Sequence, residues 1–192
     1  MKNEPSIQQL FDLSGRVALI TGASGHLGAS MANALAEASM RVVVASRDAK
    51  TGKMTAGALK GTEQGRHLSV VMDHMDEQSV SRGFDEAARI AGKIDVLICN
   101  GHEPLVADWR SVTAEQFNRQ LQNVTGYFLL PRKMREHAVH QASPASIIMI
   151  GSMYGLVGSY PDVYEDVSSA SPVAYHALKG GMAQMVRHIA CR

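Results

Sequence analysis

The sequence predicts a doubly wound α/β domain, in which a parallel sheet lies between two layers of helices. One observation is a series of short apolar runs without polar alternation, which is typical of strands buried on both faces. These expected strands span residues 16–20, 41–46, 67–72, 93–99 and 146–150. The other observation is that longer helical segments alternate with them. Right-handed crossovers should then place helices on both faces of the sheet, in a three-layer α/β/α arrangement.

The expected helices span residues 26–39, 76–92 and 113–141, and a last one spans 173–190. The third opens with Thr113 and Gln116, which have the spacing of a capping box. Pro131 lacks a main-chain N–H and is expected to kink or locally break this helix. No repeat or low-complexity linker interrupts the series, so residues 1–192 should form one domain.

The composition indicates a globular protein and excludes several classes of function. Of 192 residues, 45% are hydrophobic and 19% are charged, as in soluble domains. A net charge of +1 with scattered Lys and Arg gives no field that would attract nucleic acid or an acidic membrane. No segment resembles a membrane span, and the first fifteen residues lack the apolar run of a signal peptide. These features predict a cytoplasmic protein.

Cysteine and histidine residues give no indication of a metal site or a disulfide framework. Cys99 and Cys191 have no metal-binding spacing, which fits a reducing compartment. The eight histidines form no ligand-like cluster, so no metal is expected. Solvated surface positions are expected for His67, His102, His137 and His140.

A glycine-rich loop, Thr-Gly-Ala-Ser-Gly-His-Leu-Gly at residues 21–28, follows the first strand and opens the first helix. Small residues let the backbone turn tightly and approach a pyrophosphate, whose charge then lies at the helix N-terminus. The alternative is an ordinary strand-to-helix turn, but the position favours a Rossmann-type dinucleotide-binding domain. Cofactor contacts are expected from Gly22, Ser24, Gly25, His26, Leu27 and Gly28.

The end of the second strand bears on the choice of cofactor. An acidic residue there would bind the ribose hydroxyls of NAD, but Ser46 and Arg47 occupy this place. A guanidinium and a hydroxyl favour a 2′-phosphate through charge-assisted hydrogen bonds. NADP(H) is therefore the preferred cofactor. NAD(H) stays an alternative, in which Arg47 is a solvated loop residue and Asp48 takes the acidic role.

Tyr175 precedes Lys179 by four residues, so the two side chains share one face of a helix. They could be merely two polar residues on neighbouring turns. They also suit hydride transfer, in which a proton must move at the oxygen of the reacting carbon. A free tyrosine, with a pKa of about 10, is a poor base at neutral pH. A neighbouring ammonium group in a partly desolvated site would lower that pKa by favouring the phenolate.

Six segments in order resemble the short-chain dehydrogenase/reductase family over essentially the whole chain. They are residues 21–28, 72–76, 95–101, 123–128, 147–155 and 175–179. The resemblance implies an NAD(P)(H)-dependent oxidoreductase that interconverts a secondary alcohol and a ketone. Its catalytic tetrad would be Asn123, Ser152, Tyr175 and Lys179.

The same resemblance implies a role for each of these residues and further cofactor contacts. Tyr175 would act as general acid and base, and Ser152 would polarise the substrate oxygen. Lys179 would also hold the nicotinamide ribose, and Asn123 would hold a water behind Lys179. Further contacts with the cofactor would come from Asp73 and the main chain of His74, against the adenine, and from Asn100, Gly101 and Tyr175.

Three departures from the compact branch of the family bear on the substrate and on the extent of the fold. The middle glycine of the loop is Gly25, with His26 in its usual place, as in the sugar-nucleotide branch. The segment between Ser152 and Tyr175 is unusually long, which together with its composition favours a sugar, sugar acid or polyol substrate. Its polar residues include Tyr160, Asp162, Tyr164, Glu165 and Asp166. The C-terminal strands of the family are missing from this chain, so one sheet edge should be exposed.

Two other functions remain as alternatives to an alcohol oxidoreductase. The loop spacing favours a sugar-nucleotide epimerase or dehydratase-like enzyme. A non-catalytic cofactor-binding module would have the same fold, although it would be expected to lose Tyr175 or Lys179. The resemblance also implies a homotetramer or homodimer assembled through helices 113–141 and 173–190.

Overall fold

Five parallel strands form one sheet in the order β3-β2-β1-β4-β5. The computed structural model describes residues 4–60, 66–105, 107, 110–160, 164 and 172–191. The strands are β1 Val17–Thr21, β2 Arg41–Ser46, β3 Leu68–Val71, β4 Val96–Cys99 and β5 Ser146–Met149. Each neighbouring pair is parallel, which confirms the doubly wound α/β fold.

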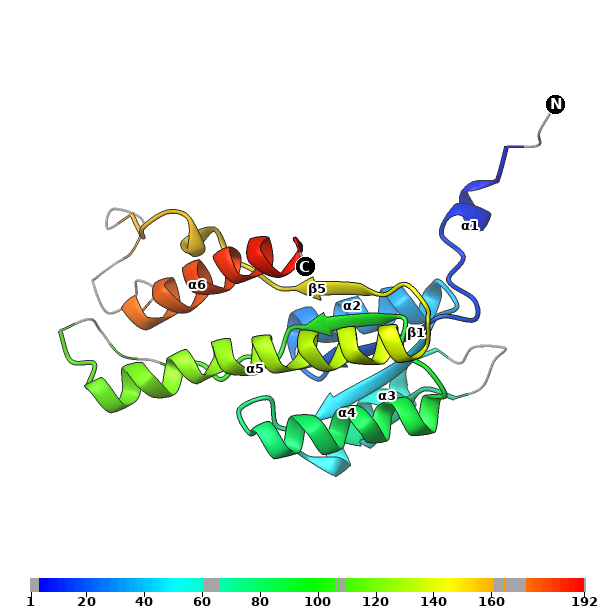
Figure 1. Ribbon diagram of the computed structural model, residues 1–192, viewed down its shortest axis with the longest axis horizontal. Helices are drawn as coiled ribbons and strands as arrows, with labels where there is room; N and C mark the ends of the chain where they lie inside the picture. The colour runs from blue at the N-terminus through cyan, green and yellow to red at the C-terminus, as the bar shows by residue number, and fades with distance from the viewer. Residues whose placement is uncertain are drawn as a thin grey trace.

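Helices cover both faces of this sheet (Figure 1). They are α1 Ile7–Leu10, α2 His26–Glu37, α3 Ala49–Ala58, α4 Glu77–Ala91, α5 Ala114–His140 and α6 Val173–Ile189, with a short 3₁₀ helix, η1, at Met153–Gly155. The apolar residues of α2 and α3 pack in one core cluster, and those of α4, α5 and α6 pack in a second. The strands belong to both clusters, so the domain has the expected three layers.

Successive residues of the central strands pack against opposite helical layers, which explains why these strands are apolar throughout. In β2, Val42 and Val44 pack against the α2–α3 side, whereas Val43 and Ala45 pack against the α4–α5–α6 side. Successive strand residues point to opposite faces, and both faces of β2 are covered. Each buried valine contributes roughly 1.5–3 kcal/mol relative to an exposed one, so both helical layers are needed to hold the sheet.

One expected helix forms where no range was predicted, and one expected helix break does not occur. The alternation of elements predicts a helix between β2 and β3 without a range, and it forms as α3, although Gly52 and Gly57 weaken its pattern. Asp48 starts it by accepting a hydrogen bond from the Thr51 N–H at 2.7 Å. The helix does not break at Pro131, because α5 continues through this residue. The alternative expectation, a kink at Pro131, stays a prediction. The helix side chains on either side of it lie in the core, and Pro131 itself is buried.

The start of α5 agrees with its sequence. Thr113 Oγ1 accepts the Gln116 N–H at 3.2 Å, and Gln116 Oε1 accepts the Thr113 N–H at 3.0 Å. The expected capping box is therefore confirmed. It fixes the N-terminal end of the helix that carries Asn123.

Of the four histidines expected on the surface, one is buried and two are half-buried. His67 is buried, and its Nδ1 accepts a main-chain N–H of β2. His137 accepts the Ile94 N–H through Nε2 at 3.1 Å. His102 borders the two cavities described below, and only His140 is exposed as expected. The expectation was wrong because polar neighbours in sequence do not report the main-chain donors that tertiary packing brings to an imidazole.

The strand β5 lies at one edge of the sheet, which is exposed as expected. Ile147 and Ile148 in this strand are 37% and 45% exposed. A groove of about 750 Å³ runs beside it, between α5 and α6. In the described ranges, no helix has both the length and the apolar character that a membrane span requires.

Candidate active site

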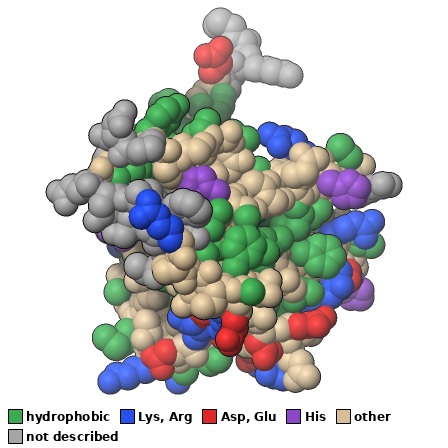
Figure 2. Space-filling model, turned by 90° about the vertical axis from the view of Figure 1, so that its left-hand side faces the viewer, with side chains coloured by type: hydrophobic (Ala, Val, Ile, Leu, Met, Phe, Trp, Pro, Cys, Tyr) green, Lys and Arg blue, Asp and Glu red, His purple; other side chains and the backbone are tan. Residues whose placement is uncertain are grey.

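A cavity of about 420 Å³ lies at the carboxyl ends of the strands, where the loops after β1 and β4 meet. These ends point to the left in Figure 1, and Figure 2 shows this side of the molecule, with hydrophobic side chains gathered near its centre. The two loops lead to helices on opposite faces of the sheet. Ligands of doubly wound domains bind at such a switch point.

The glycine loop has the shape that a phosphate group requires. Gly22 has a φ of +66°, which side chains rarely tolerate. A Cβ atom on Gly28 would lie 2.0 Å from the Gly22 carbonyl oxygen, so this helix start can approach the loop only as glycine. Gly25 is the N-cap of α2 and supplies no side-chain oxygen to the first N–H groups of the helix. These donors and the space above them fit a pyrophosphate.

Most of the residues predicted to bind a cofactor meet at this cavity. Its lining includes Gly22, Ser24, Gly25, Ser46, Arg47, His74, Asn100 and Gly101. His26 and Leu27 lie exposed in the first turn of α2, and Gly28 is buried beneath the loop. Asp73 is not part of the lining, because its carboxylate accepts the Met75 N–H at 2.9 Å.

Thr21 and Asn100 join the loops on either side of the cavity. Thr21 Oγ1 accepts the N–H groups of Asn100 and Gly101 at 3.0 and 2.8 Å. Asn100 Nδ2 donates to the Gly22 carbonyl at 3.1 Å. The end of β4 is thereby bonded to the glycine loop after β1. Thr21, which was not among the predicted site residues, holds the cavity in shape.

A second cavity, of about 310 Å³, brings Ser152 and Tyr175 together. Its lining is His102, Pro104, Leu105, Gln120, Ser152, Tyr154, Pro172 and Tyr175. Ser152 Oγ accepts the Tyr154 N–H at 3.2 Å, which leaves the Ser152 hydroxyl hydrogen free to donate. The cavity thus combines a hydroxyl donor, a phenol and several apolar side chains, as a small-molecule site requires.

Lys179 lies one turn after Tyr175 on α6 and is not part of the cavity lining. Its side chain is 4% exposed and donates from Nζ to the Ile150 carbonyl at 2.6 Å. The nitrogen lies 5.3 Å from the ring centroid of Tyr127 and 5.6 Å from that of Tyr175. Burial lowers the pKa of Lys179 to about 8. The group is therefore still cationic at neutral pH and is close to the Tyr175 ring.

Asn123 acts on a loop rather than on Lys179 directly. Its Oδ1 accepts the Glu103 N–H at 2.9 Å and lies 2.8 Å from His74 Nε2. Its Nδ2 donates to the carbonyls of Glu103 and Gln120 at 3.2 and 2.9 Å. The side-chain amide is fully used by these bonds, so a water behind Lys179, which stays a prediction, would have to be held by the Asn123 main-chain carbonyl.

His102 borders both cavities and was not predicted as a functional residue. Its ring meets that of Tyr175 edge to face, with centroids 5.4 Å apart, and its Nε2 lies 3.3 Å from Gln120 Nε2. Its Nδ1 is buried and has no partner among the described residues. Burial, followed by the charges of Lys179 and His74, lowers the pKa of His102 to about 4. A neutral imidazole with one unused nitrogen thus lies between the cavities.

The long segment before α6 is described only in part. Asp162, Glu165 and Asp166 lie outside the described residues. Tyr160 is exposed, and the hydroxyl of Tyr164 contacts that of Tyr154, which lines the second cavity. Within the described part of the chain, no group of three or more His, Cys, Asp or Glu residues is placed to hold a metal ion.

The fold and the two cavities define a Rossmann-type domain with a tyrosine–lysine pair beside its nucleotide cleft. A family model described as short chain dehydrogenase matches residues 16–192. The chain belongs to this family, as the six sequence segments indicated. The family could be identified from those segments because they include the glycine loop, which shapes the first cavity, and the segment with Tyr175 and Lys179, of which Tyr175 lines the second cavity.

Individual relatives agree with this assignment. The chain is 32% identical to cis-4-hydroxycyclohexanecarboxylate dehydrogenase of Sinomonas cyclohexanicum over 91% of its own length and 66% of that protein. It is 29% identical to D-threitol dehydrogenase of Mycolicibacterium smegmatis, over 81% of its own length and 65% of that protein. The chain thus spans about two thirds of the length of these curated relatives. A short-chain type dehydrogenase/reductase from Mycobacterium marinum matches with a TM-score of 0.84 and 29% identity, over 97% of this chain and 72% of that one.

Proposed function

We propose that the protein is an NAD(P)(H)-dependent oxidoreductase that interconverts a secondary alcohol and a ketone. Cofactor binding and catalysis would both belong to one domain over residues 1–192. The observation that carries the proposal is that Ser152 and Tyr175 line one cavity, while Nζ of the buried Lys179 lies 5.6 Å from the Tyr175 ring centroid. His102 lines both this cavity and the phosphate-binding cleft, so a substrate in one would lie next to a cofactor in the other.

The residues of the second cavity divide the work at the reacting oxygen. The nicotinamide cofactor, when bound, supplies or accepts the hydride. In the reduction, the Tyr175 hydroxyl gives its proton to the developing alkoxide and becomes a phenolate; in the oxidation, the Tyr175 phenolate takes the proton from the alcohol. The Lys179 ammonium favours the Tyr175 phenolate, and the free Ser152 hydroxyl hydrogen donates to the substrate oxygen.

NADP(H) is the preferred cofactor in this proposal. Ser46 and Arg47 line the cleft at the end of β2 and offer a hydroxyl and a guanidinium to a 2′-phosphate. The alternative role of Asp48 in binding NAD is less favourable, because its carboxylate caps α3 through the Thr51 N–H. His74, Asn100 and Gly101, which line the cleft, would complete the binding of adenine and nicotinamide. Asp73 lies outside this lining, so its contact with the adenine stays a prediction.

The substrate class is proposed to be a polyol, sugar or sugar acid. Gln120, Tyr154 and His102 add polar groups to a cavity that also has apolar walls, which suits a ligand with several hydroxyl groups. D-threitol dehydrogenase and cis-4-hydroxycyclohexanecarboxylate dehydrogenase are both named for hydroxyl-bearing compounds. The protein would act in the cytoplasm as a homodimer or homotetramer assembled through α5 and α6.

The first experiment is a titration of the purified protein with NADPH and with NADH, followed by nicotinamide fluorescence. We expect both to bind, and NADPH to bind more tightly. Turnover is then measured with NADP⁺ and D-threitol, other polyols and simple secondary alcohols. Tyr175→Phe should keep cofactor affinity and lower turnover by about 10²–10⁴-fold, the usual contribution of a positioned acid or base.

The outcomes separate the proposal from its alternatives. If the protein binds neither NADPH nor NADH, the proposed function is wrong. If the protein binds the cofactor but turns over no alcohol or ketone, and Tyr175→Phe changes neither result, the protein is a non-catalytic module. Turnover of a nucleotide sugar without net change of the cofactor would indicate the epimerase or dehydratase-like enzyme.

A further inference from the structure

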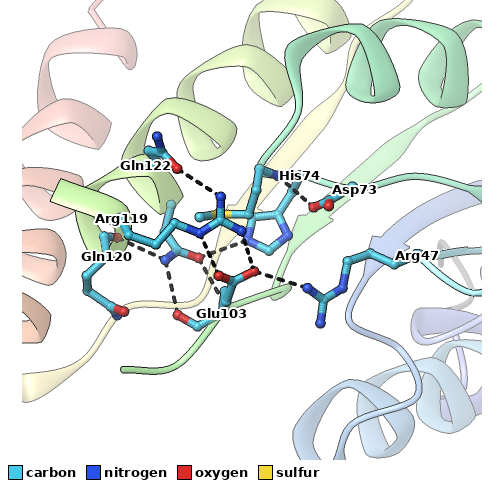
Figure 3. A network of polar contacts seen from close by, with 9 residues as sticks. Arg47, Asp73, His74, Glu103, Arg119, Gln120 and Gln122 are labelled. Carbon is cyan, nitrogen blue, oxygen red and sulfur yellow. Dashed lines mark hydrogen bonds and ion pairs between the residues drawn. The ribbon is translucent and has the colours of Figure 1, made fainter. Parts of the chain in front are cut away.

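Glu103 lies between two arginines at the rim of the nucleotide cleft (Figure 3). Its Oε2 lies 3.1 Å from Nη1 of Arg47, which comes from the end of β2. On its other side, Arg119 of α5 donates from Nε to Oε1 at 2.8 Å and from Nη2 to Oε2 at 3.0 Å. The carboxylate therefore links the residue expected to bind the 2′-phosphate to a helix on the far side of the cleft.

Hydrogen bonds with the side chain of Asn123 fix the main chain of Glu103. The Asn123 side chain bonds both the N–H and the carbonyl of Glu103, at 2.9 and 3.2 Å. Asn123 is itself fully buried. The side chain of Glu103 is 24% exposed, whereas that of Arg47 is 59% exposed. Of the two partners in the ion pair, Arg47 is therefore the one that is free to move.

The carboxylate of Glu103 is ionised at neutral pH. The hydrogen bonds from Arg119 lower its pKa most, partial burial raises it, and the charges of Arg119 and Arg47 lower it further. A permanent negative charge thus occupies the place beside Arg47. A bound 2′-phosphate would meet this charge and would have to share the same guanidinium.

We propose that Glu103 is a cofactor-selectivity residue that competes with the 2′-phosphate of NADP(H) for Arg47. This inference rests on the proposed function, because it concerns the same cleft. The ion pair must open before Arg47 can bind the phosphate, and the remaining carboxylate repels that phosphate. Both effects act only against the cofactor that carries the 2′-phosphate, so Glu103 reduces the preference for NADP(H) over NAD(H).

Arg119 determines how strongly Glu103 competes. Two hydrogen bonds from Arg119 satisfy the carboxylate without Arg47, so the ion pair with Arg47 can open at little cost. Without Arg119, the carboxylate would hold Arg47 more strongly and would repel phosphate more strongly. The two residues should therefore have opposite effects on selectivity when each is substituted.

The experiment measures dissociation constants of NADPH and NADH by nicotinamide fluorescence for the full chain and its variants. Glu103→Gln should lower the dissociation constant of NADPH by about threefold to fivefold, the range expected of an exposed ion pair. The constant for NADH should change less than about twofold. Arg119→Gln should shift the ratio of the two constants in the opposite direction, and this effect should vanish in the double variant, as expected for coupled residues.

A matched control is available on α4. Glu86 accepts two hydrogen bonds from Arg89, at 2.8 and 2.7 Å, and so forms a pair of the same kind away from the cleft. Glu86→Gln removes the same charge and should leave both dissociation constants unchanged. Circular dichroism of each variant reports whether the fold is intact.

Two results would overturn the inference. One is an unchanged ratio of dissociation constants in Glu103→Gln, and the other is weaker NADPH binding in that variant. Either would leave the proposed function intact, since the wild-type protein would still bind the cofactor. Failure of the wild-type protein to bind NADPH and NADH would instead contradict the proposed function, and the selectivity role with it.

Discussion

Lys179, the proposed partner of Tyr175, illustrates how a residue can reduce the stability of the fold that holds it. Its side chain is almost completely buried, and its ammonium group donates a hydrogen bond to the Ile150 carbonyl. Burial lowers the pKa of Lys179 from 10.5 to about 8, so the folded state disfavours the charged form. At neutral pH the folded protein must nevertheless hold the charge. The arrangement is unfavourable for stability, but in the proposed mechanism it would favour the phenolate form of the neighbouring Tyr175.

Replacing Lys179 by methionine should therefore stabilise the protein at pH 7 while abolishing turnover. The lowered pKa corresponds to a net cost of about 3 kcal/mol for the charged form. The variant would leave the Ile150 carbonyl without its hydrogen bond, which costs about 1–3 kcal/mol. The expected gain in the free energy of unfolding is about 1 kcal/mol, measured by urea unfolding. Lys50→Met, at an exposed position in α3, serves as control and should change stability little.

The effect of Lys179→Met should depend on pH with a defined sign. Below pH 8, lysine is protonated in both states and the wild-type protein carries the full cost. Between pH 8 and 10.5 only the unfolded state binds the proton, so wild-type stability rises with pH and the advantage of the variant disappears. A variant that is less stable at every pH would show that the hydrogen bond, rather than the buried charge, dominates.

At the scale of elements, the contact between β1 and β4 is fixed at both ends by side chains. Thr21 bonds the end of β4 at the cleft, as described above. At the opposite end, Asp95 accepts the Val17 N–H at 2.8 Å and pairs with Arg16 and Lys93 at 3.0 and 3.1 Å. Burial raises the pKa of Asp95, but the hydrogen bonds and charges of these partners outweigh it and lower the pKa below its ordinary value.

Asp95→Asn should destabilise the protein by about 2 kcal/mol at pH 7, since hydrogen bonds to a charged group contribute about 1.5–3 kcal/mol. Because the folded pKa is lowered, the wild-type advantage is present above pH 4 and is lost as the pH falls through the folded value. Urea unfolding at pH 7 and at pH 3 measures both. Asp85→Asn is the control, because it breaks the ion pair between an exposed carboxylate and Lys133. Equal losses for the two variants would contradict the role of Asp95.

The elements also show what the sequence could predict. Strands such as β2 were predictable because both faces are buried, which requires apolar residues throughout. The pairing of Tyr175 with Ser152 followed from motifs that belong to two fixed elements, η1 and α6. The roles of Glu103 and His102 could not be predicted from a motif. Hydrogen bonds with Asn123, twenty residues later in the chain, fix Glu103, and only the folded structure shows that His102 borders both cavities. Adjacency to Asn100 and Gly101 was the only sequence signal for them.

The whole molecule is organised around the cleft, which draws its lining from the ends of β1, β2 and β4 and from the residues just after β3. Each of these strands leads into a different helix, and together the helices cover both faces of the sheet. A ligand bound in the cleft contacts all of these units at once. Unfolding any of them would release the ligand, so binding should stabilise the whole domain.

NADPH should therefore raise the melting temperature of the protein. At about 100 times its dissociation constant, a ligand specific for the folded state contributes about 2.7 kcal/mol, which for a chain of this size is roughly 5–10 °C. Gly28→Ala should remove this shift, because its Cβ would lie 2.0 Å from the Gly22 carbonyl oxygen and force the phosphate loop out of place. Gly57→Ala adds the same methyl group in open space on α3 and should keep the full shift. Differential scanning fluorimetry with and without NADPH provides the measurement. A full shift in Gly28→Ala would show that the cofactor binds without the glycine loop, and the cleft would then lose its assigned role.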